Sequence, residues 1–326
     1  MHRDPTHIPA ASFDLSDWTH LSVSGSEAAN FLHNFCTADV KALRPGDIRE
    51  AFIPDIKGRI LGHGLILSTD ADEFRLIAVP RASQTLLPHF QKYLLGADAN
   101  FEDVEPSQGL LCCVGDNVPD ILATAFGSSA PLENDKGKWV ETDAGRLFLA
   151  SAPLTLLPTV LLLGSRDAVA SFRESLPAEM MAFGIPELFE LLRIEAGFPW
   201  HGRDISDANL AQEAGRTKQA INFQKGCYLG QEPIARLDAM GHTNRELRGL
   251  LFPNVPAQAG DAVLHQGQQI GTITSAMQAP EQERTVALAM LKTKHAEPGT
   301  ELVVQTANGE SPALVYWPDL GSVATS

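Results

Sequence analysis

The chain has 326 residues, 44% of them apolar and 20% charged, and a formal net charge of −15. An acidic chain repels phosphate backbones, which argues against direct binding of nucleic acid through broad electrostatics. No apolar run is long enough to span a bilayer, and the N-terminus lacks the apolar stretch of a secretory signal. We therefore expect a cytoplasmic protein of two or three domains that does not contact a membrane.

The first part of the chain alternates helix-like and strand-like segments. Ser24 and Glu27 form a capping-box pattern before apolar residues at helical spacing, which predicts a helix within 24–36. Strands are predicted on both sides of a turn at Gly58, and a further helix within 82–96. This alternation is typical of an α+β or α/β core.

The middle of the chain contains the strongest helical pattern in the sequence. The segment 185–197 carries an apolar face, with Pro186 near its start and Gly197 at its end. A hairpin is predicted before it at 132–154, followed by a short buried strand at 159–164.

Beyond about Arg236 the pattern changes to short β-type runs separated by Gly, Pro or Asn. This predicts a small all-β domain, either a barrel or a sandwich. We divide the chain into a larger region of residues 1–240 and a C-terminal β domain of residues 241–326.

The cysteines are few and dispersed, at Cys36, Cys112, Cys113 and Cys227. Their spacing does not suit a zinc site or an iron–sulfur cluster held by this chain alone, so no metal site is predicted. The first three lie in apolar helix or strand patterns and are expected in the core.

Cys227 lies in the segment KGCYLGQE, which begins at Lys225. A thiol becomes reactive when cationic neighbours or helix N-terminal N–H groups stabilise its thiolate and solvent reaches it. Lys225 could act as such a neighbour, and Gly226 and Gly230 allow a sharp turn. A helix beginning in the residues that follow would also favour a thiolate. A small buried cysteine in a turn is the alternative.

The polar segment before this cysteine contains candidate ligand contacts. Glu195 follows an apolar helix face, and its carboxylate could accept two N–H donors from a flat heterocycle. A solvated glutamate at a helix end is the alternative. Asp204 could bind a ligand or cap the next turn. Glu213 and Arg216, in and just after a second EAG segment, are predicted to form an ion pair.

These segments together carry a resemblance to a known family. KGCYLGQE, with RIEAGFPWHGRD before it and GHTNRELRGL after it, resembles the signature of the YgfZ family. Members of that family are folate-binding relatives of the glycine-cleavage T-protein, an aminomethyltransferase. The earlier segments LSVSGSEAANFLHNFCTADVKALRPGD and DIKGRILGHGLIL are similar to it as well, so the resemblance extends over nearly the whole chain.

The resemblance implies an α+β fold of two interleaved subdomains that bind folate, followed by a small C-terminal β-barrel. It also implies tetrahydrofolate or a derivative as the cofactor, with Glu195 in the position that holds the pterin ring. We count Asp204, Arg216 and Tyr228 as further candidate cofactor contacts. Lys225 and Cys227 form the candidate functional pair.

The family role implied by the resemblance is to support the assembly or repair of iron–sulfur proteins, including radical enzymes that modify tRNA. Those proteins or their assembly machinery would be the partners, and Cys227 the required thiol. The alternative is a folate-dependent aminomethyl or one-carbon transferase.

One departure from the T-proteins favours the accessory role. Active T-proteins place a catalytic aspartate shortly after the strand that here reads FRLIAVP, whereas RASQTLLPHF follows in this chain and contains no carboxylate. A fragment of a demethylating flavoenzyme is a third alternative, although no GxGxxG follows a predicted strand.

Overall fold

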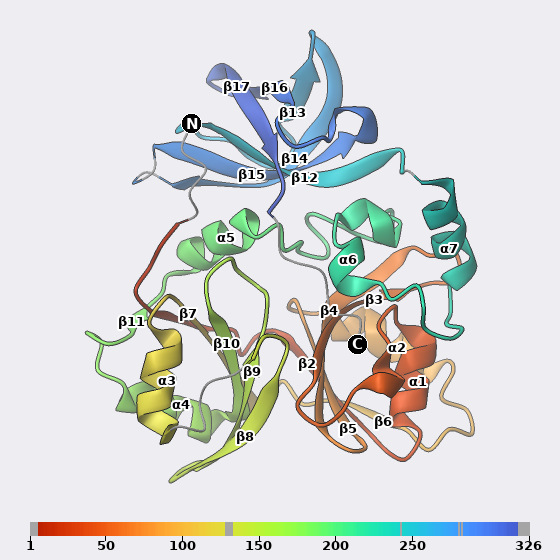
Figure 1. Ribbon diagram of the computed structural model, residues 1–326, viewed down its shortest axis with the longest axis vertical. Coiled ribbons are helices and arrows are strands. Elements are labelled where there is room, and N and C mark those ends of the chain that lie inside the picture. Colours follow the sequence, from red (N-terminus) through yellow and green to blue (C-terminus); the bar gives the residue numbers. More distant parts are fainter. Residues whose placement is uncertain (1–5, 128–132, 242, 280, 282, 319–326) are drawn as a thin grey trace.

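The computed structural model of the protein describes residues 6–127, 133–241, 243–279, 281 and 283–318. Two lobes of mixed strands and helices lie side by side, and a β-barrel lies above them with α5 in between (Figure 1).

A six-stranded sheet forms the first lobe, in the order β11-β1-β7-β10-β9-β8. α3 (Val118–Phe126) and α4 (Arg166–Ser175) pack their apolar residues against one face of this sheet. The strands are β1 (Ala11–Asp14), β7 (Gln108–Val114), β8 (Gly137–Thr142), β9 (Gly145–Ser151), β10 (Thr159–Ser165) and β11 (Ala182–Phe183).

A five-stranded antiparallel sheet forms the second lobe, in the order β3-β4-β5-β2-β6. Its apolar core also takes in two helices, α1 (Ala28–Phe35) and α2 (Ser83–Gln91). The other elements are β2 (Thr19–Ser24), β3 (Ile48–Pro54), β4 (Ile60–Asp70), β5 (Glu73–Ala78), β6 (Asn100–Asp103) and the short 3₁₀ helix η1 (Val40–Ala42).

The two lobes are interleaved along the chain. β1 belongs to the first sheet, β2 to β6 build the second, and the chain then returns to the first sheet for β7 to β11. One apolar core contains residues of both sheets, among them Leu65 of β4 and Leu161 of β10. Neither lobe can therefore be cut out of the chain as one continuous segment.

The first helix begins later than the sequence pattern predicts. Ser24 is the last residue of β2 and pairs with Asn100, while α1 starts only after Glu27. Glu27 accepts a hydrogen bond from Asp98 N at 2.7 Å and takes no part in a capping box. Strand pairing has overridden the local capping signal in this segment.

A helical region connects the lobes to the barrel. It contains α5 (Pro186–Glu195), the 3₁₀ helix η3 (Ala211–Ala214), α6 (Thr217–Ala220) and α7 (Gln231–Met240). In the part of the chain that the structure describes, no helix has the length and apolarity needed to cross a membrane.

The barrel closes in the order β12-β15-β14-β13-β16-β17, with β17 pairing back onto β12. Its apolar side chains fill a core of their own, while α5 packs on the outside against β14 and β15. Its elements are β12 (Arg245–Pro253), β13 (Ala262–His265), β14 (Gln268–Ala279), β15 (Arg284–Lys292), η5 (Thr293–His295), β16 (Glu301–Thr306) and β17 (Gly309–Tyr316).

Three of the four cysteines are buried, as predicted, and Cys227 is exposed. β7 directs Cys112 and Cys113 to opposite faces, so that they lie in different apolar cores. Burial raises the pKa of Cys36 and of both β7 thiols, for Cys113 to about 12. The buried thiols are therefore held in the protonated, unreactive form.

Candidate ligand-binding site

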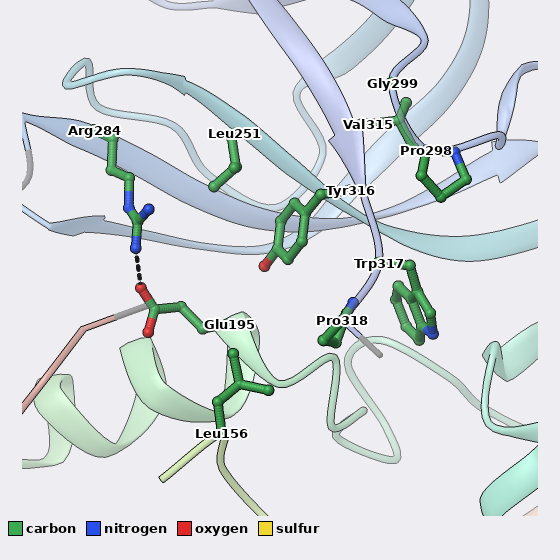
Figure 2. A pocket seen from close by; sticks show the side chains of 10 residues that line it. All are labelled: Leu156, Glu195, Leu251, Arg284, Pro298, Gly299, Val315, Tyr316, Trp317 and Pro318. Atoms are coloured by element: carbon green, nitrogen blue, oxygen red, sulfur yellow. Dashed lines mark hydrogen bonds and ion pairs between the residues drawn. The ribbon is translucent and has the colours of Figure 1, made fainter. Parts of the chain in front are cut away.

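A cavity of about 250 Å³ lies between the end of α5 and the barrel (Figure 2). Its polar lining residues are Glu195, Arg284 and Tyr316, and the rest of its wall is largely apolar. Small-molecule sites typically combine an apolar wall with a few convergent polar groups in this way. The remaining lining residues are Leu156, Leu251, Pro298, Gly299, Val315, Trp317 and Pro318.

Glu195 is the last residue of α5, and only 3% of it is exposed. Its Oε1 accepts hydrogen bonds from Arg284 Nη2 at 2.5 Å and from Thr6 Oγ1 at 2.9 Å. Its Oε2 accepts one from Thr6 N at 3.0 Å. The ion pair and these two bonds compensate the burial of a charged carboxylate. The alternative of a solvated glutamate at a helix end is therefore wrong.

Local structure on both sides of Glu195 holds its carboxylate at the cavity. Pro186 occupies the first turn of α5, as the sequence predicts, and the apolar side of the helix is buried. Gly197 ends the helical segment with φ of +63°, a conformation that glycine adopts without strain. Tyr316 of β17 donates its hydroxyl hydrogen to Ile194 O at 3.1 Å, which ties the barrel to the last helical turn.

The two EAG segments of the sequence form turns against the same aromatic ring. Gly197 and Gly215 have φ of +63° and +71°. A Cβ atom on either glycine would lie 2.8 Å from the Trp317 ring, so neither position has room for a side chain. Since Trp317 lines the cavity, these two turns fix one of its walls.

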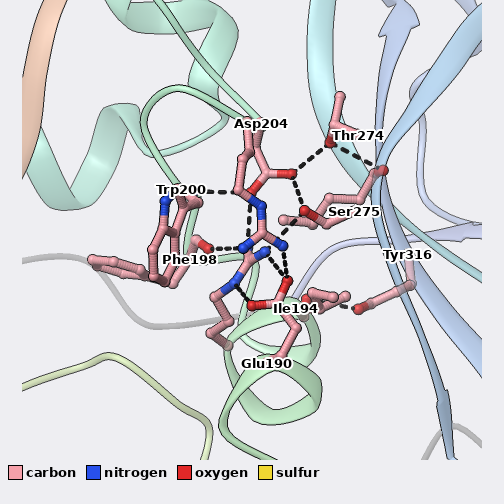
Figure 3. A network of polar contacts seen from close by, with 11 residues as sticks. Glu190, Ile194, Phe198, Trp200, Asp204, Thr274, Ser275 and Tyr316 are labelled. Atoms are coloured by element: carbon pink, nitrogen blue, oxygen red, sulfur yellow. Dashed lines mark hydrogen bonds and ion pairs between the residues drawn. The ribbon is translucent and has the colours of Figure 1, made fainter. Parts of the chain in front are cut away.

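Asp204 belongs to a buried network that joins the α5 region to the barrel (Figure 3). Its Oδ2 accepts hydrogen bonds from Arg193 Nη1 at 2.7 Å and from Trp200 N at 2.8 Å. Its Oδ1 accepts from Thr274 Oγ1 at 2.6 Å and from Ser275 Oγ at 2.7 Å. A carboxylate accepts about four hydrogen bonds, so these partners use its capacity. The geometry favours a structural role over the predicted cofactor contact.

Arg216 is fully buried and pairs with Glu50 of β3. Its Nε donates to Glu50 Oε1 at 2.8 Å, and His63 Nε2 lies 2.8 Å from the same oxygen. Burial alone would raise the pKa of Glu50, but Arg216 and His63 lower it to about 2. The predicted ion pair between Glu213 and Arg216 is wrong, because Glu213 pairs with Arg245 at 3.1 Å.

Arg216 contacts the backbone next to the cavity residue Glu195. Its Nη1 donates to Ala196 O at 3.3 Å, directly after Glu195 in the chain. The guanidinium therefore supports the turn that carries Glu195. The predicted direct contact of Arg216 with a cofactor stays a prediction.

Lys225 is directed into the protein, toward the end of α1. Its Nζ donates to His33 O at 2.6 Å, to Cys36 O at 2.8 Å and to Ala38 O at 2.6 Å. An ammonium group has three N–H donors, and these carbonyl oxygens use all of them. Burial lowers the pKa of Lys225. These contacts favour a helix-capping role over the predicted stabilisation of a Cys227 thiolate.

The backbone around Cys227 forms the turn that the glycines suggest, although only one of them is required. Gly230 has φ of +79°, and a Cβ atom there would lie 2.2 Å from Asp55 O. At Gly226 a Cβ atom would meet only the His33 ring, at an ordinary 3.5 Å. α7 begins directly after Gly230, so the predicted helix is present. Since Cys227 is exposed, the alternative of a buried cysteine is wrong.

Tyr228 lies on a different depression from Glu195. Only 8% of it is exposed, and it lines an open hollow of about 800 Å³ beside α7. Lys225 Nζ lies 4.8 Å from the centre of its ring. The candidate residues of the sequence thus fall in two places, and the structure does not bring Tyr228 to the Glu195 cavity.

Sequence reasoning missed Thr6, Arg284 and Glu50. Glu50 stands in the apolar strand IREAFIP, and a carboxylate in such a strand is a signal for a buried ion pair. Thr6 and Arg284 offer no comparable signal, because they reach Glu195 from 189 and 89 positions away in the chain.

Comparison with known domains agrees with this architecture. Residues 6–156 match the GCVT N-terminal domain, and residues 245–318 match the glycine cleavage T-protein C-terminal barrel domain. The crystal structure of the glycine cleavage system aminomethyltransferase T from Bartonella henselae superposes with a TM-score of 0.85 at 22% identity, over 95% of this chain and 86% of that chain. The chain therefore matches both T-protein domains and has the T-protein fold, which confirms the predicted α+β class with its C-terminal barrel.

Curated relatives point in the same direction. An aminomethyltransferase of Streptomyces coelicolor is 28% identical over 308 residues, which are 90% of this chain and 81% of that protein. A putative chloroplastic transferase of Arabidopsis thaliana is 26% identical over 303 residues, covering 89% of this chain and 67% of that protein. This is a T-protein-like chain with aminomethyltransferase relatives, and the closer resemblance to the YgfZ family stays a prediction.

Proposed function

We propose that this protein binds a reduced folate in the cavity at Glu195 and acts on a folate-linked aminomethyl or one-carbon unit. The observation that carries the proposal is the buried Glu195 carboxylate, which faces the cavity and accepts an N–H and an O–H donor side by side. The aminomethyltransferase relatives support the same reading.

The residues of the cavity fit a pterin ring. A pterin is flat and presents adjacent N–H donors on its pyrimidine edge, which match the two oxygens of Glu195. Tyr316 and Trp317 provide aromatic surface for its ring. A cavity of about 250 Å³ is slightly smaller than typical small-molecule sites, roughly 300–1,000 Å³, and suits the bicyclic head of a folate with its tail outside.

Tetrahydrofolate would supply the ring nitrogen that carries the transferred carbon unit. The chain's own residues bind and orient it: Glu195 accepts the donors of the pterin edge, and Arg284 holds that carboxylate in place through an ion pair. The apolar wall excludes water, which strengthens these polar contacts. Arg216 supports the turn behind Glu195 through Ala196 O.

Calorimetry with tetrahydrofolate tests the binding site. Glu195→Gln should weaken binding by about 1.5–3 kcal/mol, because an amide replaces only part of a charge-assisted acceptor pair. Glu301→Gln, an exposed change in β16, is the matched control and should leave the affinity unchanged. Equal affinity of the wild type and Glu195→Gln would remove this cavity from the proposal.

A glycine-cleavage half-reaction with the pure protein tests the transfer step. Turnover that requires tetrahydrofolate and falls in Glu195→Gln would support a transferase. Intact folate binding without turnover would favour the second candidate function.

The second candidate is an accessory factor for iron–sulfur proteins, with those proteins or their assembly machinery as partners. Two observations favour it: Cys227 is exposed on its turn, and the segment around α2 carries no carboxylate. Complementation of cells that lack the native factor tests it. Cys227→Ser should abolish rescue if the thiol is required, while tetrahydrofolate binding remains as the control for folding.

A further inference from the structure

Thr6 donates hydrogen bonds to both carboxylate oxygens of Glu195 in this structure. Its backbone N–H and its hydroxyl donate to the two different carboxylate oxygens, at 3.0 and 2.9 Å. Thr6 is 5% exposed, and the pale red N-terminal segment reaches the carboxylate in Figure 2. The candidate ligand carboxylate is therefore already engaged by two donors from within the chain.

The two donors of Thr6 resemble the donor pair of the ligand class proposed above. An aminopyrimidine edge presents two neighbouring N–H groups that can bind both oxygens of one carboxylate. A ligand of this kind and Thr6 compete for the same acceptors, because each oxygen accepts only about two hydrogen bonds and Oε1 already holds Arg284.

The contacts of the neighbouring residues show how far the chain would have to move. Ile8 O accepts a hydrogen bond from Asp116 N at 3.1 Å, and Pro9 O accepts one from Asn117 N at 2.8 Å. β1 begins at Ala11 and is paired on both sides. From Ile8 onward the segment is therefore anchored, and among the described residues His7 makes only an exposed side-chain contact, 3.4 Å from Nδ1 to Asp116 Oδ2. Thr6 can leave Glu195 by rotation about His7 without disturbing the sheet.

We propose that Thr6 is an internal competitor for the pterin position and sets the affinity of the cavity for its ligands. The proposal rests on the proposed folate site. A ligand with two adjacent N–H donors replaces both bonds of Thr6, whereas a ligand with one donor leaves one carboxylate oxygen poorly satisfied. Displacement of Thr6 lowers the affinity of every ligand by the same amount, and only a ligand with a complete aminopyrimidine edge replaces both lost bonds.

Calorimetry with Thr6→Val tests this competition. Valine keeps the size of threonine but removes the hydroxyl donor, so tetrahydrofolate should bind about three- to tenfold more tightly. Thr306→Val is the matched control, because it removes a hydroxyl that donates to Gly309 O in the β16–β17 turn. It should leave the affinity unchanged.

The 2-desamino analogue of tetrahydrofolate gives a second measure of the competition. It lacks one donor of the edge and should bind less tightly, but because it also has to displace Thr6, it should gain the same factor in affinity as tetrahydrofolate in Thr6→Val. Hydrogen–deuterium exchange gives a readout that does not depend on a variant. Saturation of the wild-type protein with tetrahydrofolate should speed exchange at residues 6–7, although ligands usually slow exchange around their sites.

The outcomes separate this inference from the proposed function. If Glu195→Gln weakens folate binding but Thr6→Val leaves it unchanged or weakens it, Thr6 is not a competitor and the inference is wrong. If Glu195→Gln has no effect on folate binding, the proposed site itself fails. Slower exchange at residues 6–7 in the complex would also overturn the inference.

Discussion

The cavity at Glu195 and the turn at Cys227 hold their polar groups in opposite ways. Around the cavity, carboxylates are buried and each is paired with an arginine, as in Glu195 with Arg284 and Asp204 with Arg193. At the turn the thiol is exposed, and the neighbouring lysine contacts backbone carbonyls at the end of α1. The first region satisfies its charges by partners within the chain, whereas the second presents one accessible group.

This difference shows that closeness in sequence is a poor guide to chemical partnership. Lys225 stands two residues from Cys227 but holds the end of α1. Thr6 and Arg284 stand far from Glu195 in the chain and yet contact it directly. A functional model of either region therefore has to be tested on the contacts of the folded chain.

The largest expected effect comes from breaking the network that holds the cavity region to the barrel. Asp204→Ala leaves the buried Arg193 without one of its compensating charges and removes the links to β14. We expect the free energy of unfolding to fall by about 3–5 kcal/mol. Urea denaturation measures this, with the exposed Asp238→Ala of α7 as the control. A loss below about 1 kcal/mol would show that the network contributes little.

Lys225→Met separates a structural lysine from an activating one. The change leaves buried carbonyls at the end of α1 without their donor, which should cost about 1–3 kcal/mol of folding stability. The alkylation rate of Cys227 should stay the same, because Lys225 Nζ is engaged elsewhere. The exposed Lys218→Met of α6 is the control. A marked fall in the Cys227 rate would restore the predicted role of Lys225.

Acidification should lower the free energy of unfolding, because it protonates the buried His20 only when the chain unfolds. Burial, with a smaller contribution from Arg75, lowers the pKa of His20 to about 3. Between pH 6.5 and 3 the unfolded chain binds a proton at this residue that the folded chain does not. As the pH is lowered through this range, the free energy of unfolding should therefore decrease by about 1.4 kcal/mol per pH unit because of this residue alone.

The comparison of His20→Gln with the wild type isolates this contribution. Urea denaturation at several pH values should show a shallower loss of stability in the variant between pH 6 and 4. Glu50, whose pKa is lowered to about 2, adds to the acid loss only below about pH 4.5. Equal slopes for both proteins would show that His20 does not titrate on unfolding.

The smallest effect on stability is expected at the exposed turn. Cys227→Ser should change the free energy of unfolding by less than about 0.5 kcal/mol and leave folate binding intact. At limiting alkylating reagent, mass spectrometry should find label on Cys227 before Cys36, Cys112 or Cys113, because burial protects those three. Earlier labelling of a buried cysteine would contradict the exposure assigned to this turn.

Several helices, strands and buried residues of this protein could be predicted from its sequence, because they depend on local patterns. The apolar face between Pro186 and Gly197 predicts α5 with both of its ends. The short β-type runs after residue 240 predict the barrel strands, since alternation and turn residues act within a few positions. The burial of Cys36 and of the two β7 cysteines was predictable as well, because each lies in an apolar helix or strand pattern.

The pairing of charges was decided only by the tertiary structure. From sequence, Arg216 has Glu213 as its obvious partner, but the fold places it on Glu50 of another lobe. Ser24 and Glu27 satisfy a local capping pattern, but strand pairing takes Ser24 into β2. Such choices are settled by burial, because a buried charge or backbone group must find a partner wherever the packed chain offers one, however distant in sequence.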